Sequence, residues 1–264
     1  MSVLMQISDP HFGTEQAQVV DALMVLAQQH QPNLVVLSGD ITQRARLEQF
    51  RTASAFMNKL RIPFLAIPGN HDIPLFDLWS RLRRPYARFT TFFGPELEPF
   101  YSSHDLMVIC VNTTRAWRHK HGEISAKQIE RVADILLKAT PQQLRIVVVH
   151  QPIAVTRKAD AENLLRGHAY ALPRWSASGA DLIMGGHIHL PYVLALHDHA
   201  RPMWAVQAGT AVSSRVRLNV PNSVNLLRWG VDASDGNCHI EQWDYSSEKN
   251  VFVRAVVNQV APKH

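Results

Sequence analysis

Short runs of apolar residues recur along the 264-residue chain, and most of them are near-continuous rather than alternating with polar residues. Continuous apolarity over a few residues is typical of strands that are buried on both faces. We therefore expect strands at residues 3–7, 34–37, 64–67, 107–111, 146–149, 182–184 and 203–206.

Between the early runs, apolar residues repeat at helical spacing. Val19, Leu23 and Leu26 would share one face of a helix, and residues 47–60 and 129–136 contain the same kind of stripe. Strands that alternate with helices indicate an α/β fold, in which helices cover the faces of a largely parallel sheet.

The C-terminal third has a different pattern. Residues 223–230 and 238–245 resemble strands, and the turn-rich residues 232–236 lie between them. This pattern predicts a β-hairpin at about residues 223–245, and therefore mixed sheets. An exposed edge of the hairpin could support a homodimer, and the alternative is an ordinary edge of a second sheet.

Two segments interrupt the alternation of strands and helices. Residues 73–104 are rich in aromatic residues and arginine, and residues 152–175 are largely polar. Each segment follows the end of an expected strand, so each could overhang a site as a cap. The alternative is a packed insertion with a solvated outer face.

Polar residues gather where five of the expected strands end. In an open α/β sheet, the carboxyl ends of the strands line the ligand crevice, so residues at these ends meet at one place. One such residue would be weak evidence, but five strand ends indicate a shared site. The residues concerned are Asp9, His11, Asp40, Asn70, His71, Asp72, His150, His187 and His189.

Their chemistry favours metal ions. Carboxylate, amide carbonyl and imidazole groups suit Mn, Fe, Zn or Co, and no thiolate is among them. In an extended backbone, the alternate residues of Asp9-x-His11 and of His187-x-His189 turn to the same side. Seven ligands are too many for one zinc ion but suit two ions that share a carboxylate. The predicted ligands are Asp9, His11, Asp40, Asn70, His150, His187 and His189.

The charge of such a centre suggests its substrate. Two divalent ions bring four positive charges, Asp9 and Asp40 bring two negative ones, and a bridging hydroxide leaves about +1. A positive pocket that excludes water favours a phosphoryl anion. Metal ions also lower the pKa of a bound water toward neutrality, which makes hydrolysis the expected reaction.

Composition sets limits on the other classes of function. A chain that is 46% hydrophobic can form one large core, so we expect a single domain over residues 1–264. The net charge of +5 suits an anionic small molecule, but it is too small and too dispersed to indicate nucleic acid. The two cysteines do not form a disulfide framework. No signal peptide or transmembrane run is evident, so we expect a cytoplasmic protein, with peripheral membrane contact left open.

At this point the motifs resemble a known family. The ordered series Asp9-x-His11, Gly39-Asp40, Gly69-Asn70-His71-Asp72, His150 and Gly186-His187-Ile188-His189 is similar to that of the calcineurin-like metallophosphoesterases. It spans residues 9–189 and includes all five blocks. In detail the chain resembles the bacterial branch that contains class III cyclic nucleotide phosphodiesterases, and also related hydrolases of UDP-diacylglucosamine.

The resemblance implies a four-layer αββα sandwich with two mixed β-sheets. It also implies how the ligands divide between the ions, with Asp40 bridging. One ion would take Asp9, His11, Asp40 and His189, and the other would take Asp40, Asn70, His150 and His187. His71 would be a histidine near the leaving group that binds no metal.

Several residues have more than one interpretation. His71 could be a catalytic general acid or a cationic stabiliser, and otherwise it only positions Asn70. Asp72 could give a supporting hydrogen bond around the ligands. Arg44, Asn112 and Arg115 follow strand ends and could contact a substrate phosphate, although exposed arginines are common there.

Two further stretches bear on the surroundings of the site. The run at residues 209–217 is rich in serine and arginine and could reach the rim of the site. The pair His119 and His121 has the spacing of metal ligands but no supporting set, so both are interpreted as surface residues.

The leading hypothesis is a phosphodiesterase with two metal ions, Mn and/or Fe with Zn or Co as alternatives, in which a metal hydroxide attacks phosphorus. A 3′,5′-cyclic nucleotide is the first choice of substrate, on the resemblance alone. The alternatives are a UDP-2,3-diacylglucosamine-type pyrophosphate hydrolase, a DNA nuclease, and a non-catalytic scaffold. The sequence leaves the native metals, the preference for monoesters or diesters, and the oligomeric state open.

Overall fold

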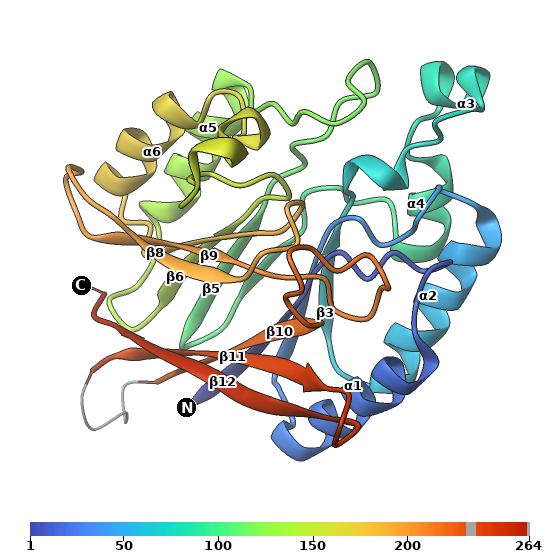
Figure 1. Ribbon diagram of the computed structural model, residues 1–264. Helices are drawn as coiled ribbons and strands as arrows, with labels where there is room; N and C mark the ends of the chain where they lie inside the picture. The colour runs from blue at the N-terminus through green and yellow to red at the C-terminus, as the bar shows by residue number, and fades with distance from the viewer. Residues whose placement is uncertain (231–235, 263–264) are drawn as a thin grey trace.

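Two six-stranded sheets form the centre of the molecule in the computed structural model, which describes residues 1–230 and 236–262 (Figure 1). In order across the first sheet, the strands are β12 (Val251–Val260), β11 (Cys238–Ser246), β10 (Ser223–Trp229), β1 (Ser2–Ile7), β2 (Leu34–Ser38) and β3 (Phe64–Ile67). Strands β1, β2 and β3 are parallel, and the other three are antiparallel to their neighbours. This sheet is therefore mixed.

The second sheet is also mixed. Its order is β4 (Phe100–Ser102), β5 (Leu106–Cys110), β6 (Leu144–Val148), β7 (Leu182–Gly185), β9 (Met203–Gln207) and β8 (Tyr192–Leu196). Strands β5, β6, β7 and β9 are parallel, while β4 and β8 are antiparallel strands at the two edges. The near-continuous apolar runs of the sequence correspond to the parallel strands of both sheets.

Helices cover the outer face of each sheet (Figure 1). The first sheet is covered by α1 (Ala17–His30), α2 (Leu47–Leu60) and α4 (Ala87–Phe93). The second is covered by α5 (Ala126–Leu136) and α6 (His168–Ala177). The short helix α3 (Leu78–Arg83) projects from the body near the top of the view. In the described part of the chain, no helix combines the length and apolarity that crossing a bilayer requires.

Three apolar clusters hold these layers together. The cluster between the sheets includes Leu4, Val36, Ile146 and Leu182, all nearly inaccessible to solvent. A second cluster packs the first sheet against its helices, and a third packs the second sheet against α5 and α6 around the buried Trp175. Burial of apolar surface is the main favourable contribution to such a fold. The expected four-layer αββα sandwich with two mixed sheets is confirmed.

The predicted hairpin is present, since β10 pairs with β11 in antiparallel register. Most of the turn expected at residues 232–236 lies outside the described residues. The hairpin is not an edge of the sheet, however, because β11 also pairs along its length with β12. Within the described residues, the hairpin therefore has no exposed edge through which a homodimer could form, and that prediction is wrong. The edge strand on this side of the sheet is β12.

The two interrupting segments each combine packing with overhang. In residues 73–104, Phe89 of α4 is fully buried, and Phe92 stacks on Phe50 of α2 at 6.1 Å between ring centroids. In residues 152–175, a short 3₁₀ helix (Lys158–Asn163) lies beside the cleft described below, and α6 begins at His168. Residues 73–104 thus pack in part against the body and residues 158–163 lie beside the cleft, while a role for either segment as a cap stays a prediction.

Candidate metal centre and its cleft

The carboxyl ends of β1, β2 and β3 in one sheet meet those of β6 and β7 in the other. Gln6 near the end of β1 links the sheets, because its Nε2 donates to the carbonyl of Gly185 at 3.0 Å. The predicted ligands all lie at or beyond these strand ends. The structure therefore brings together groups that are as much as 180 residues apart, from Asp9 to His189.

Left-handed backbone is concentrated at the predicted ligands. Asp9, His11, Asp40, His187 and His189 have φ angles of +49°, +44°, +48°, +71° and +56°, respectively. Such conformations cost roughly 1–3 kcal/mol each for residues other than glycine and cluster at functional sites. The strain points to a function for this group that outweighs its cost in stability.

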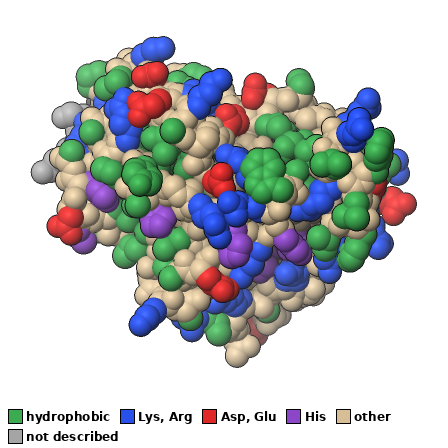
Figure 2. Space-filling model, turned by 90° about the horizontal axis from the view of Figure 1, so that it is seen from above, with side chains coloured by type: hydrophobic (Ala, Val, Ile, Leu, Met, Phe, Trp, Pro, Cys, Tyr) green, Lys and Arg blue, Asp and Glu red, His purple; other side chains and the backbone are tan. Residues whose placement is uncertain are grey.

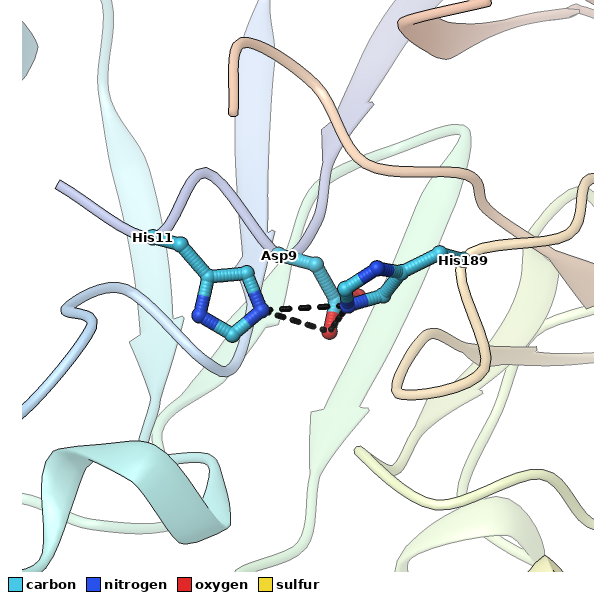
Figure 3. A group of neighbouring side chains, drawn as sticks. All are labelled: Asp9, His11 and His189. Carbon is cyan, nitrogen blue, oxygen red and sulfur yellow. Dashed lines mark hydrogen bonds and ion pairs between the residues drawn. The ribbon is translucent and has the colours of Figure 1, made fainter. Parts of the chain in front are cut away.

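The first group of ligands consists of Asp9, His11 and His189, whose side chains converge (Figure 3). The Nε2 atoms of His11 and His189 are 3.0 Å apart, and His189 Nε2 is 3.4 Å from Asp9 Oδ1. His189 Nδ1 donates to the carbonyl of Arg215 at 2.7 Å, which leaves the Nε2 lone pair facing the other two side chains. This is the arrangement of a histidine ligand fixed by an outer hydrogen bond.

The second group consists of Asp40, His150 and His187. His150 Nε2 lies 3.2 Å from Asp40 Oδ1, and its Nδ1 donates to the carbonyl of Ser38 at 2.9 Å. The other carboxylate oxygen of Asp40, Oδ2, lies 3.8 Å from His11 Nε2 in the first group. Asp40 thus faces both groups, as a bridging carboxylate would.

Several buried polar atoms of these residues lack a hydrogen-bond partner within the described residues. They include Asp9 Oδ1, Asn70 Oδ1 and His187 Nδ1. Because buried polar atoms are almost always satisfied, an unsatisfied set at one place calls for a missing partner. Oxygen and imidazole nitrogen atoms without thiolate suit divalent cations of intermediate hardness, so the donor set fits two metal ions.

The electrostatics of the centre favour positive charge. Burial opposes ionisation of Asp9, but the hydrogen bond and charge of His189 outweigh it and lower the pKa of Asp9 to about 2. Burial also opposes ionisation of Asp40, yet neighbouring histidines, His150 first, hold its pKa well below the usual value. Burial opposes protonation of His150, but Asp40 raises its pKa to about 9. Two ionised carboxylates in a buried site thus stabilise added cationic charge.

Two glycines allow the close approach of these chain segments. Gly39 has a φ of +96°, and a Cβ there would collide with the imidazole of His150. A Cβ on Gly186 would collide with Ser8 and with the carboxylate of Asp9. Glycine is required at Gly39 for its backbone conformation and at Gly186 for the contact.

Asp72 does not enter the centre but joins the loops that carry two of the ligands. Its carboxylate accepts hydrogen bonds from the backbone amides of Ile41, Thr42 and Gly69 at 2.8–3.0 Å, and one from the Thr42 hydroxyl. Ile41 follows Asp40, and Gly69 precedes Asn70. Asp72 is therefore placed to fix the positions of both ligands.

His71 lies beside the centre, 4.8 Å from His11 between ring centroids and perpendicular to it. Its Nδ1 is 2.9 Å from the carbonyl of Gln43, so this nitrogen carries a proton and donates it. Its Nε2 faces Nη1 of Arg215 at 3.3 Å and accepts from it. His71 thus lies between the ligand His11 and the guanidinium of Arg215, and its catalytic role stays a prediction.

The three expected substrate contacts are divided between two hollows. Arg44 lines the cleft above the ligands, with its guanidinium 5.9 Å from the centre of the Phe76 ring. Asn112 and Arg115 line a separate hollow with Tyr86 and Trp117. Arg115 donates from Nη1 to the carbonyls of Asn112 and Thr114 and from Nη2 to Gln128, so both terminal nitrogens are bonded within the protein. The structure does not bring Asn112 and Arg115 to the centre.

The cleft above the ligands has a volume of about 810 Å³ and a strongly basic rim. Figure 2 looks onto this face and shows Lys, Arg and His side chains gathered at its centre, with hydrophobic side chains on both sides. The lining includes Arg215 and Arg217 of the run that was expected to reach the rim, and also His119, which had been interpreted as a surface residue; sequence reasoning did not single out Lys120 and Asp160. Arg215 and Arg217 reach this rim because residues 208–222 follow the carboxyl end of β9, which is parallel to β7.

Known proteins resemble this chain at moderate to low identity. The glycerophosphodiester phosphodiesterase GpdQ of Enterobacter lignolyticus is 37% identical over 83 residues, which cover 26% of this chain and 29% of that protein. A probable cyclic nucleotide phosphodiesterase of Synechococcus is 25% identical over 166 residues, which cover 62% of this chain and 61% of the relative. The matched regions thus span less than two thirds of either relative.

A comparison of structures supports the fold. A dimetal phosphatase from Danio rerio superposes with a TM-score of 0.73, covering 99% of both chains at 12% identity. The family model described as calcineurin-like phosphoesterase matches residues 2–191. This range contains the site strands β1, β2, β3, β6 and β7 and all seven predicted ligands. With the ordered ligand motifs and the two-sheet sandwich, this match shows that the chain belongs to the calcineurin-like phosphoesterase family.

Proposed function

We propose that this protein is a hydrolase that uses two metal ions to cleave phosphodiester bonds. The observation that carries the proposal is the pair of ligand groups that face the two oxygens of Asp40 at the floor of a basic cleft. Such a pair places two cations close together, and a basic rim attracts an anionic ester.

We assign the predicted ligands to the ions as the family resemblance implies. Asp9, His11, Asp40 and His189 would hold one ion, and Asp40, Asn70, His150 and His187 would hold the other. When bound, two such ions activate a water and stabilise the oxygens that attack and leave phosphorus. Mn and Fe are the first choices, because mixed oxygen and nitrogen ligands suit them, and Zn and Co are the alternatives.

The chain's own residues would orient the ester. Arg44 and Arg215 reach the cleft with basic side chains, and His71 lies between the ligands and Arg215. Asp72 would hold the loops that carry Asp40 and Asn70 in fixed positions relative to each other. Each group then acts without reorganising during the reaction, which is how preorganised polar sites lower barriers.

A 3′,5′-cyclic nucleotide is our first choice of substrate. The support is the named activity of the Synechococcus relative, together with a cleft large enough for a nucleotide. A glycerophosphodiester is the corresponding choice from the Enterobacter relative. Both are small phosphodiesters and would use the same centre.

A second candidate is a pyrophosphate ester with a lipid chain, of the UDP-2,3-diacylglucosamine type. It is favoured by exposed apolar side chains beside the cleft: Phe76 lies against Arg44, and Leu78, Trp79 and Leu82 of α3 are 72%, 68% and 78% exposed. Exposed apolar groups of this size at a rim often mark a binding surface. A DNA nuclease and a non-catalytic scaffold remain weaker alternatives, since no long basic stripe is evident and no predicted ligand has been lost.

One panel of substrates tests these proposals. Protein loaded with Mn²⁺ would be assayed on bis-p-nitrophenyl phosphate, p-nitrophenyl phosphate, cyclic nucleotides, glycerophosphodiesters, UDP-2,3-diacylglucosamine and DNA. We expect turnover of the aryl diester and of at least one natural diester, and loss of turnover after chelation. Two bound metal ions without hydrolysis of any ester would sink the enzymatic proposal and favour the scaffold.

A further inference from the structure

The guanidinium of Arg215 occupies a distinctive position at the edge of the metal centre. Its Nη1 lies 3.0 Å from Gln43 Oε1, 3.3 Å from His71 Nε2 and 3.5 Å from His11 Nδ1. Within residues 1–230 and 236–262, every hydrogen bond of this side chain is made by Nη1. Nε and Nη2 remain as donors on a residue that lines the cleft.

The charge of Arg215 has no carboxylate partner among the described residues. Arg217, two positions along the same cleft wall, differs in this respect: its Nη2 forms a 2.5 Å ion pair with the buried Asp160. An arginine whose Nη1 donates to Gln43 and His71, and which has no carboxylate counter-ion among the described residues, is suited to receive an anionic ligand.

The backbone of Arg215 is fixed as firmly as its side chain. Its amide donates to Ser213 Oγ at 3.0 Å, and Ser213 is itself fully buried and bonded to Thr14. Its carbonyl accepts from Nδ1 of the predicted ligand His189 at 2.7 Å. The same residue thus orients a metal ligand through its backbone and aims a cation over the centre through its side chain.

The neighbours of Arg215 act as its positioning residues. Gln43 contributes twice, because its carbonyl accepts from His71 Nδ1 and its side-chain oxygen accepts from Arg215. His71, with its proton on Nδ1, turns the Nε2 lone pair to the guanidinium. Both neighbours thus bring an acceptor to Nη1 of Arg215.

We propose that Arg215 is the residue that binds the non-bridging phosphoryl oxygens of the substrate, with His71 and Gln43 holding its guanidinium in place. The proposal rests on the proposed hydrolysis for its catalytic part, and it adds the cationic group that the ligands alone do not supply. A planar guanidinium can donate to two oxygens of one phosphoryl group, and this interaction strengthens as negative charge grows on them.

The test compares Arg215→Ala, the nearly isosteric neutral Arg215→Met, and Arg215→Lys with the wild type. Lys120→Ala is the matched control, because it removes one positive charge from the same cleft at an exposed residue paired with Glu162. Each Mn²⁺-loaded protein would be assayed on bis-p-nitrophenyl phosphate. Binding of inorganic phosphate would be measured by calorimetry, and bound metal by elemental analysis.

We expect kcat/KM to fall roughly 100-fold or more in the two neutral variants, and less in Arg215→Lys. The affinity for phosphate should fall at least about tenfold, since a charge-assisted pair is lost. Metal content should stay the same, because the carbonyl that fixes His189 remains. Added guanidinium ion should restore part of the activity of Arg215→Ala but not of Arg215→Met, whose side chain fills the space.

A double-mutant cycle tests the positioning role. Gln43→Ala should lower activity in the wild-type background and have little effect in the Arg215→Ala background, because residues that act through one another are not additive. If Gln43 had a merely structural role, Gln43→Ala would lower the activity in both backgrounds by the same factor.

The proposal is overturned if Arg215→Ala and Arg215→Met stay within about threefold of Lys120→Ala, or if their losses follow loss of metal. If the wild type cleaves no ester yet binds phosphate through Arg215, the anion site stands and the proposed hydrolysis falls. If the wild type neither binds phosphate nor cleaves esters, both fall.

Discussion

Asp40 is the residue on which both ligand groups depend, since its two carboxylate oxygens face His150 and His11. We expect Asp40→Ala to lose both metal ions. Asn70→Ala should keep about one ion, because Asn70 is assigned to a single site. Elemental analysis after Mn²⁺ loading and gel filtration measures this difference. Equal metal content in the two variants would show that Asp40 does not bridge.

Gly39 offers a second test at this scale, with Gly94 as its control. Both have φ near +90°, but a Cβ would collide with His150 at Gly39 and meets nothing within 4 Å at Gly94. Gly94→Ala should therefore cost only the backbone strain, roughly 1–3 kcal/mol. Gly39→Ala should cost at least about 2 kcal/mol more, since an overpacked site must shift. Urea denaturation measures both, and equal costs would contradict the packing argument.

At the residue scale, sequence could point to the ligands because their chemistry is explicit at the strand ends. Asp40 and His150 follow apolar runs, and hard ligands rarely gather at five such ends unless they share a site. The role of Arg215 was not accessible in this way. Its significance comes from having no carboxylate partner among the described residues and from its contacts with Gln43 and His71, and neither is written in the spacing of the chain.

At the scale of elements, Asp72 joins the loop after β2 to the loop after β3. We expect Asp72→Ala to lower the free energy of unfolding by roughly 2–4 kcal/mol, because several buried amide donors lose their acceptor. Metal affinity should fall about tenfold or more, because Asp40 and Asn70 would no longer be held in fixed positions relative to each other. Chemical denaturation and metal titration measure the two effects.

The control for that variant is Asp77→Ala, which removes the exposed N-cap carboxylate of α3. It should cost much less stability than Asp72→Ala, because its partners Ser80 and Arg88 remain accessible to water, and it should leave metal affinity unchanged. If Asp72→Ala behaved like Asp77→Ala, the two loops would be held by other contacts, and the link from Asp72 to the ligands would be wrong.

Besides the two hairpin strands β10 and β11, the strands that the sequence predicted are those with continuous apolarity, because the parallel strands here are buried on both faces. Strands β8 and β12 escaped prediction for the opposite reason. β8 is half-buried along most of its length, and Val256 and Val257 of β12 are both 45% exposed at the edge of the sheet. An edge strand carries little hydrophobic signal, so its pairing depends on the neighbouring strand rather than on its own pattern.

At the scale of the whole molecule, one buried acid links stability to pH at a distance from the centre. Asp181 precedes β7, at the end of the strand opposite to the predicted ligands. Burial raises its pKa to about 6, although the amide of Arg145 donates to its carboxylate at 2.9 Å and the charges of Arg145 and Arg201 lie nearby. Desolvation therefore outweighs the favourable contacts.

The direction of the pH effect follows from this raised pKa. Between pH 3.8 and about 6 the folded protein keeps a proton on Asp181 that the unfolded chain releases. Its contribution to stability is thus fully present below pH 3.8 and is lost as the pH rises through about 6. The loss is on the order of 2–3 kcal/mol, since each pKa unit corresponds to about 1.4 kcal/mol.

Asp181→Asn imitates the protonated acid at every pH and keeps an oxygen to accept from Arg145. The stability of this variant relative to the wild type should therefore increase by roughly 2–3 kcal/mol from pH 4 to pH 7. Urea denaturation at both pH values measures the change, and Asp134→Asn on the exposed face of α5 should show none of it. Comparing variants removes the opposite trend of Asp9 and Asp40, whose lowered pKa values favour the folded state as the pH rises. An Asp181→Asn difference that stays constant with pH would mean that the native protein already admits water to this carboxylate.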